Sequence, residues 1–326
     1  MSQNPIHNPH DKLTKTTFSD IPTAVAFLQE HLEPGISNSI DWATLRVESG
    51  TFIAEEFAAS ESDLLYTATI NQSKAFLYIL FEHQSTDDRW IALRLLAYMV
   101  RIWEKALRAD SSLKKLPPIV PIVLAQSNKL WQAPVRFSDL IEVPSNLANE
   151  LAAHTPDFSY RLVELYRIPF DKILGTPMGI LTMRALKAER IGALLDDPVW
   201  DEPLLTQLPP FAIEMLLRYI LRADIDKDQF LRKIKNITNQ SIQSSAMTLE
   251  EQFRQEGRQE GRQEGRREEQ IHSKQQSVME VLETRFEQVP EGLIEAIENI
   301  NDLPKLTQLL ASAARCTDLE AFAASL

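Results

Sequence analysis

Two apolar runs around a short polar segment constrain the fold of this 326-residue chain more than any other feature. The segment Asp63–Ile70 has the composition of a strand, and Ala75–Phe81 is apolar throughout. The polar residues Asn71–Lys74 between them predict a β-hairpin. Because the second run is apolar at both alternating sets of positions, we expect a sheet that is covered on both faces.

The segments before and after this hairpin have apolar residues at helical spacing. We expect helices within residues 11–35 and 88–107, a second short helix at Trp42–Leu45, and further helices at 180–195 and 211–222. A β-branched run at Ile119–Leu124 predicts a third strand, in which Pro121 favours an edge position or a bulge. The sequence therefore predicts an α/β fold with a mixed (α+β) sheet flanked by helices.

A four-residue repeat occupies residues 254–269 and places Gly257, Gly261 and Gly265 on one slowly drifting helical stripe. Two interpretations stay open: a solvated, partly helical linker, or a stripe that lets a second helix approach closely in a dimer. Residues after the repeat have helical spacing again. We expect four parts: a core at 8–150, a mostly helical extension at 151–250, a charged linker at 251–274, and a helical tail at 275–326 that could oligomerise.

Composition excludes several classes of protein. The net charge is −12 and no part of the chain is basic, so binding of DNA would need a local patch or a metal ion. The single cysteine, Cys316, excludes a disulfide framework and a zinc site built on several thiolates. No apolar window is long enough to span a membrane, and residues 1–10 do not form a secretory signal, so we expect a cytoplasmic protein without a membrane partner.

The hairpin offers the best candidate for chemistry. A turn centred on Asn71–Lys74 would place Asp63 opposite Glu82, and opposed carboxylates repel each other unless a cation lies between them. Mg²⁺ or another divalent cation would remove that cost, and Gln84 would emerge on the same face as Glu82. The alternative is structural: Asp63 could cap a strand from solvent, and Glu82 could pair with Arg94.

Several segments, taken in order, carry a resemblance to a known family. They are His10–Lys12 with Lys15 and Phe18, Ser62–Tyr66, Tyr78–Ser85, Arg94–Tyr98 and Leu116–Val123. In this set the chain resembles the Rpn, or YhgA-like, family of recombination-promoting nucleases and putative transposases, within the PD-(D/E)XK nuclease superfamily. The run Glu82–Ser85 after a hydrophobic strand is the most specific of these marks, and the resemblance covers about residues 8–250.

The resemblance implies a restriction-endonuclease-like core in which Asp63 and Glu82 bind the metal. Gln84 would take the place that a lysine holds in the wider superfamily, where the lysine helps to orient or activate the attacking water. A neutral amide supplies no positive charge, so Lys15 is a possible accessory residue, as are Glu55 and Glu56 for a further carboxylate. The chain departs from the family pattern at residues 125–131, which lack the usual glycine.

The function that follows is a Mg²⁺-dependent DNA endonuclease linked to recombination or mobile elements, dimeric through its C-terminal region. The competing function is a catalytically weak or inactive nuclease-fold protein that serves as a DNA-associated regulatory or oligomerisation module. Retention of Asp63, Glu82 and Gln84 favours the enzyme, whereas the net charge of −12 favours the module.

Overall fold

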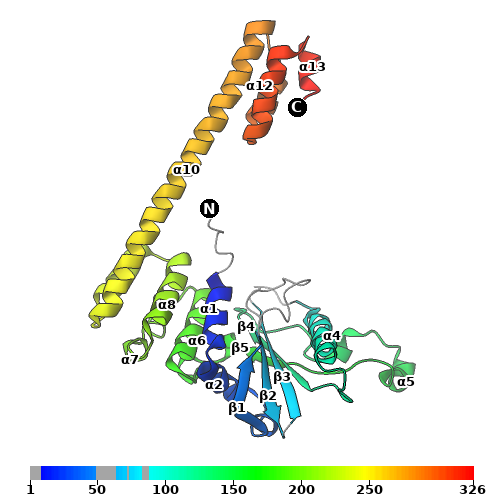
Figure 1. The fold of residues 1–326 in the computed structure, drawn as a ribbon. Coiled ribbons are helices and arrows are strands. Elements are labelled where there is room, and N and C mark those ends of the chain that lie inside the picture. Colours follow the sequence, from blue (N-terminus) through cyan, green and yellow to red (C-terminus); the bar gives the residue numbers. More distant parts are fainter. Residues whose placement is uncertain (1–8, 49–63, 72, 83–87) are drawn as a thin grey trace. The chain divides into compact units, whose positions relative to one another are not determined.

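The chain forms two compact units, Met1–Leu249 and Glu250–Leu326 (Figure 1). The computed structural model describes residues 9–48, 64–71, 73–82 and 88–326. The four-part division expected from the sequence stays a prediction.

A five-stranded mixed sheet lies in the first unit, with helices on both of its faces (Figure 1). The strands lie side by side in sequence order. The second strand is antiparallel to its neighbours, the first and the third, and the last two strands run parallel to the third. The predicted α/β class is therefore confirmed. The strands are β1 (Ile40–Val47), β2 (Leu64–Ile70), β3 (Ser73–Glu82), β4 (Ile119–Ala125) and β5 (Arg161–Glu164).

The β2–β3 hairpin forms with a tighter turn than expected. Ile70 pairs with Ser73, which leaves two residues between the paired positions instead of four. Asn71 adopts φ 48°, in the left-handed region that two-residue hairpin turns use. Asparagine tolerates this conformation better than most residues, because its short polar side chain can hydrogen-bond locally.

The tighter turn corrects the predicted register. The expected turn, which would place Asp63 opposite Glu82, would also pair Leu65 with Leu80; Leu65 pairs with Tyr78 instead, so that pairing is wrong. The offset is two residues, and an even offset keeps each side chain on its predicted face. The expected pairing of Asp63 with Glu82 lies outside the described residues, because Asp63 is not described.

The expected short helix at Trp42–Leu45 is also wrong, because this segment lies in β1. The register of β1 against β2 shifts between Asp41 and Arg46, where the strand is irregular. There the backbone N–H of Thr69 donates to Oγ1 of Thr44 at 2.8 Å. The irregularity breaks the alternation of apolar and polar residues from which a strand is recognised in a sequence.

Pro121 lies in an interior strand whose register with β3 is unbroken, which corrects the expectation of an edge strand or a bulge. β4 pairs with β3 on one side and with β5 on the other. Pro121 is paired with Tyr78 of β3, but β5 joins β4 only from Ile122 onward. Since proline has no N–H to donate, it is accommodated where the second ladder has not begun.

Helix α4 (Ile91–Ala109) covers one face of the sheet, as Figure 1 shows, and confirms the helix expected at 88–107. Its buried side chains form one apolar cluster with side chains from three strands. The members from α4 are Ile91, Ala92, Leu95, Tyr98 and Ile102, and those from the strands include Leu65, Phe76 and Val123.

Helices α1, α2 and α6 cover the opposite face, and α8 packs against α1 and α6 (Figure 1). The hydroxyl of buried Tyr66 in β2 donates to the carbonyl of Phe18 in α1 at 2.5 Å, and burial raises the pKa of this phenol. The hydroxyls of Thr17 and Thr182 are hydrogen-bonded at 2.8 Å and link α1 to α6. The helices of this unit besides α4 are α1 (Pro9–Ser19), α2 (Ile21–His31), α3 (Pro34–Ser37), α5 (Ala148–Ala152), α6 (Pro177–Arg190), α7 (Glu202–Leu205), α8 (Pro210–Arg222) and α9 (Lys227–Lys235).

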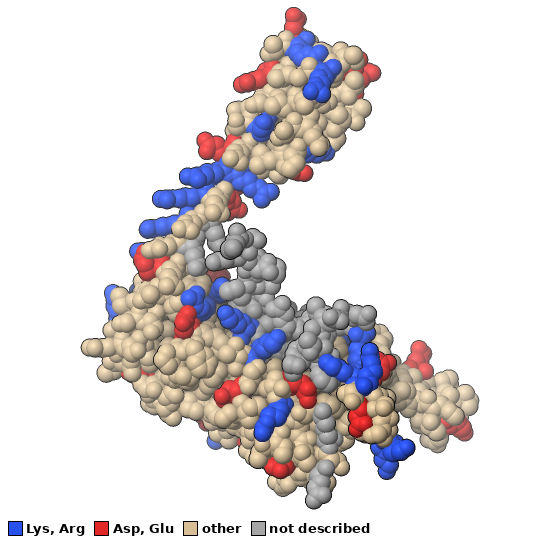
Figure 2. Space-filling view, in the orientation of Figure 1, with Lys and Arg blue, Asp and Glu red and all other residues tan. Residues whose placement is uncertain are grey.

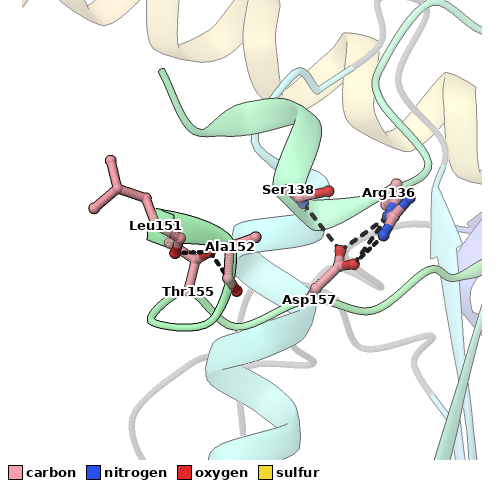
Figure 3. Close-up of polar contacts among 6 residues, drawn as sticks. All are labelled: Arg136, Ser138, Leu151, Ala152, Thr155 and Asp157. Carbon is pink, nitrogen blue, oxygen red and sulfur yellow. Dashed lines mark hydrogen bonds and ion pairs between the residues drawn. The ribbon is translucent and has the colours of Figure 1, made fainter. Parts of the chain in front are cut away.

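A polar clamp closes the connection between β4 and β5 (Figure 3). Nε of Arg136 donates to both carboxylate oxygens of Asp157, at 3.1 and 2.9 Å, and Nη2 donates as well. These hydrogen bonds lower the pKa of Asp157 to about 2. The neighbouring rings of Phe137 and Phe158 stack with centroids 5.7 Å apart, so the clamp adjoins the apolar cluster under α4.

Four helices account for the second unit: α10 (Gln240–Phe286), which starts in the first unit, α11 (Glu291–Glu298), α12 (Leu303–Arg315) and α13 (Leu319–Ala323). The unit has an apolar core of its own. Its buried members are Val278, Leu282, Leu293, Ile297, Leu306, Leu309, Ala313 and Phe322. The four-residue repeat lies within α10. Within the described residues, no helix combines the length and the apolar character needed to cross a membrane.

His31, at the end of α2, is half-buried against the ring of Phe27, with ring centroids 4.7 Å apart. Nε of Arg161 in β5 donates to the carbonyl oxygen of His31 at 2.6 Å. Burial and, to a smaller extent, the charge of Arg161 lower the pKa of His31 to about 4. The imidazole is therefore neutral in the native protein under conditions in which an unfolded chain would protonate it.

We expect His31 to make the first unit sensitive to acid. Its native pKa lies below the ordinary value, so its stabilising contribution is complete above about pH 6.5 and falls as the pH drops toward 4. At pH 5 the protonation of His31 in the unfolded chain lowers the free energy of unfolding by about 2 kcal/mol. Urea unfolding near pH 7 and pH 5 measures it: His31→Gln should lose less stability than the wild type on acidification. Exposed His154→Gln is the control, and an equal loss in all three proteins would contradict the prediction.

Candidate active site

Of the candidate site residues, the structure describes Lys15 and the backbone of Glu82. Glu82 is the last residue of β3, one residue beyond the strand expected at Ala75–Phe81. The remaining candidates, Glu55, Glu56, Asp63 and Gln84, lie outside the described residues, and their roles stay predictions.

The carboxyl ends of three parallel strands meet at the edge of the sheet where Glu82 lies. Glu82 is paired with Ala125, the last residue of β4, and Ala125 with Glu164, the last residue of β5. Glu82 and Glu164 thus stand in one row, two strand spacings or about 9.5 Å apart between Cα atoms. β2 is antiparallel to β3 and begins toward the same end of the sheet: its first residue, Leu64, pairs with Ile79, three residues before Glu82, and Asp63 directly precedes Leu64 in the sequence.

Glu164 is a half-buried carboxylate that the sequence analysis missed. Its Oε1 accepts from the backbone N–H of Trp131 at 2.9 Å, and its Oε2 accepts from Nη1 of Arg167 at 3.3 Å. The side chain is 16% exposed. Trp131 in turn donates from Nε1 to the hydroxyl of Tyr160 at 2.9 Å. Glu164 therefore fixes the loop after β4, and it was missed because β5 has only four residues and lacks a periodic signal.

Gln126, the residue after β4, is the second polar group missed at this edge. It is 1% exposed, and neither its Oε1 nor its Nε2 has a hydrogen-bond partner among the described residues. A buried amide without partners costs about 1–3 kcal/mol, so proteins rarely keep one without a reason. Its position in the sequence could have identified it, because Gln126 directly follows the apolar run Ile119–Ala125, and polar residues in that position lie at the carboxyl edge of the sheet.

The first turn of α4 brings a positive charge to the same face and edge. α4 connects the end of β3 to the start of β4, so its N-terminal turn lies near the carboxyl ends of the strands. Nη1 of Arg94 in this turn donates to Oδ2 of Asp88 at 3.0 Å. The alternative in which Arg94 pairs with Glu82 stays a prediction, because the side chain of Glu82 is not described.

Lys15 is exposed on α1, and α1 covers the face of the sheet opposite to α4. Glu164 lies on the α4 face, because Leu162, two residues before it, packs into the cluster under α4. The structure therefore does not bring the helix of Lys15 over Glu164, and an accessory role for Lys15 stays a prediction.

The chemistry of the candidate ligands fits a hard divalent cation. Carboxylate and amide oxygens are the donors that Mg²⁺ prefers, and the candidate set consists of two carboxylates, Asp63 and Glu82, beside the amide of Gln84. Within the described residues, no three His, Cys, Asp or Glu side chains cluster closely enough to hold a metal. The described part of the chain thus offers no rival metal site.

Comparison with known proteins identifies relatives of this chain. A family model described as a putative transposase, YhgA-like, matches residues 8–198. The recombination-promoting nuclease RpnA of Escherichia coli K12 is 30% identical over 79% of this chain and 87% of its own length. RpnC of the same organism is 30% identical over 52% of this chain and 55% of its own length, about half of each protein.

A further relative in E. coli K12 is named an inactive recombination-promoting nuclease-like protein, RpnE. It is 27% identical over 79% of this chain and 85% of its own length. No solved structure matches the chain. The family model covers more than half of the chain, and it agrees with the long alignment to RpnA. The chain therefore belongs to the family of YhgA-like putative transposases that includes the recombination-promoting nucleases.

Proposed function

We propose that this protein is a divalent-metal-dependent endonuclease that hydrolyses phosphodiester bonds of DNA in the cytoplasm, in recombination or mobile-element biology. The observation that carries the proposal is the shared edge of the hairpin, where β2 begins next to Asp63 and β3 ends at Glu82. Relatives named recombination-promoting nucleases support the reaction class.

In the proposed site, Asp63 and Glu82 hold Mg²⁺ or another divalent cation. A cation held there polarises the scissile phosphate and lowers the pKa of a bound water. Gln84 orients the attacking water through its amide, which can both donate and accept hydrogen bonds. Glu164 keeps the loop after β4 in place beside this edge through its hydrogen bond from Trp131.

A second candidate function is a catalytically weak or inactive nuclease-fold protein that regulates or assembles others on DNA. Two observations favour it: the relative named inactive, RpnE, and the net charge of −12. It differs from the first proposal in one measurable respect, because it predicts DNA association without hydrolysis.

Plasmid cleavage separates the two candidates. We expect purified protein to nick plasmid DNA with Mg²⁺ and to lose this activity in EDTA. Asp63→Ala and Glu82→Ala should each lower the rate by at least about 100-fold, because loss of a ligand exceeds the 10- to 100-fold cost of losing a residue that only supports one.

Glu104→Ala is the matched control, because it removes an exposed carboxylate of α4 that only pairs with Arg108. Circular dichroism should show that all variants are folded. Cleavage that persists in both site variants would rule out the proposed carboxylates, and folded wild-type protein that never cleaves would favour the inactive module.

Gln126 provides an independent test of the same edge. Gln126→Met keeps the volume and removes a buried amide without partners among the described residues, so the free energy of unfolding should rise by about 1–3 kcal/mol. Exposed Gln132→Met should stay within about 0.5 kcal/mol. A loss of stability in Gln126→Met would contradict the prediction. Greater stability together with slower cleavage would indicate that the amide is retained for activity.

We also propose that the second unit, which has its own apolar core, makes the protein a dimer, because a double-strand cut needs two active sites. Light scattering on the full chain should then give about twice the mass of 37.1 kDa. The mass of a single chain at every accessible concentration would exclude the dimer.

A further inference from the structure

A hollow of about 260 Å³ lies between α1 and α8, within the first unit. It is far too small for a DNA duplex, yet large enough for a single nucleobase. Its apolar lining includes Leu13 of α1 and Met215 of α8. The buried Tyr219 completes this lining, and its hydroxyl donates to Oε2 of Glu189 at 3.0 Å, so the lining is held in place.

Positive side chains surround the hollow. Lys12 on α1 and Arg222 on α8 are exposed, and Arg218 lies one turn before Arg222. Among the described lining residues, Lys12, Arg218 and Arg222 stand against one carboxylate, Glu214, which accepts from Nε of Arg218 at 2.9 Å. Figure 2 shows Lys and Arg side chains gathered over α1 and α8. On a chain with a net charge of −12, this is a local patch of the kind that a polyanion needs.

An exposed aromatic ring lies beside these cations, and we call the hollow together with the ring and the cations the groove. Phe211, in the first turn of α8, is 55% exposed and lines the hollow. An aromatic face next to cations is the combination with which proteins bind single-stranded nucleic acid, because the ring stacks on a base while the cations contact phosphates. Bases within a duplex are already stacked on each other and cannot use such a ring.

We propose that the groove between α1 and α8 binds a single strand of DNA, with phosphates at Lys12, Arg218 and Arg222 and a base against Phe211. Only the identity of the polyanion as DNA rests on the proposed function. The groove belongs to the helices on the face of the sheet opposite to α4 and Glu164. Substitutions in it therefore leave the proposed metal ligands unchanged.

Binding is measured with the full chain in EDTA, so that cleavage does not interfere. The probe is a short fluorescent oligonucleotide, single-stranded or annealed to its complement, and fluorescence anisotropy is followed over a range of salt concentrations. Phe211→Ala should weaken single-strand binding by about 5-fold or more, with the salt dependence unchanged. Arg222→Gln should weaken it and reduce the slope of log affinity against log salt by about 0.7.

Two controls match these variants. Leu147→Ala removes an exposed apolar side chain elsewhere, and Arg108→Gln removes an exposed arginine of α4; both should bind as the wild type does. The proposal is overturned if Phe211→Ala and Arg222→Gln also bind like the wild type, if the wild type binds no single strand, or if Phe211→Ala weakens duplex binding equally. If the wild type cleaves plasmid with Mg²⁺ but the groove variants bind single strands as the wild type does, this proposal alone is contradicted. If binding depends on the groove but no protein cleaves plasmid, only the proposed nuclease activity is contradicted.

Discussion

Burial of β3 and β4 on both faces is the constraint on which the rest of the first unit depends. A strand that is apolar on both sides needs a helical layer above and below it, and the parallel pairing of β3 with β4 requires a connection that crosses one face. α4 meets both requirements, while α1, α2 and α6 cover the other face. The parallel strands therefore all end at one edge, and the polar groups that follow the apolar runs collect there. Glu82, Gln126 and Glu164 come together at this edge although they are far apart in the sequence.

The parts of this fold that the sequence predicts are those with long, regular patterns. The apolar run Ala75–Phe81 and the helix at 88–107 carry enough residues to show their period, and both form as expected. The turn was predicted two residues too long because Asn71 enters a left-handed conformation without the glycine that usually marks such turns. Glu164 was missed for a different reason, since a four-residue strand is defined only by its neighbours in the sheet. Of the candidate site, the strand expected at Ala75–Phe81 is present, and β3 extends one residue further, to Glu82. The register was not predicted correctly, because it depends on the turn.

Charged side chains are distributed unevenly over the protein, and for the binding of nucleic acid this distribution matters more than the net charge. The chain is strongly acidic overall, yet several of its carboxylates are committed to local ion pairs: Asp157 with Arg136, Asp201 with Arg184 and Glu164 with Arg167. Such pairs cancel within a few ångströms and contribute little at the distance of an approaching polyanion, since salt screens exposed charges beyond about 10 Å. A patch such as the one over α1 and α8 then acts on its own surroundings. The net charge alone therefore does not decide whether the protein binds nucleic acid.

Helix α10 is stabilised by packing at its two ends and not in its middle. Every described side chain from Arg254 to Gln270 is exposed, and the three glycines of the repeat cost together about 2.5–3 kcal/mol relative to alanine. Ion pairs such as Arg254 with Glu251 recover a few tenths of a kcal/mol each, which does not offset that cost. The packing that stabilises the helix lies at its ends: Ile242, Ala246 and Leu249 are buried in the first unit, and Val278 and Leu282 in the core of the second. The described side chains of the repeat thus pack against no other part of the chain that the structure describes, which leaves solvation or a partner to explain its regular glycine, arginine and glutamate stripes.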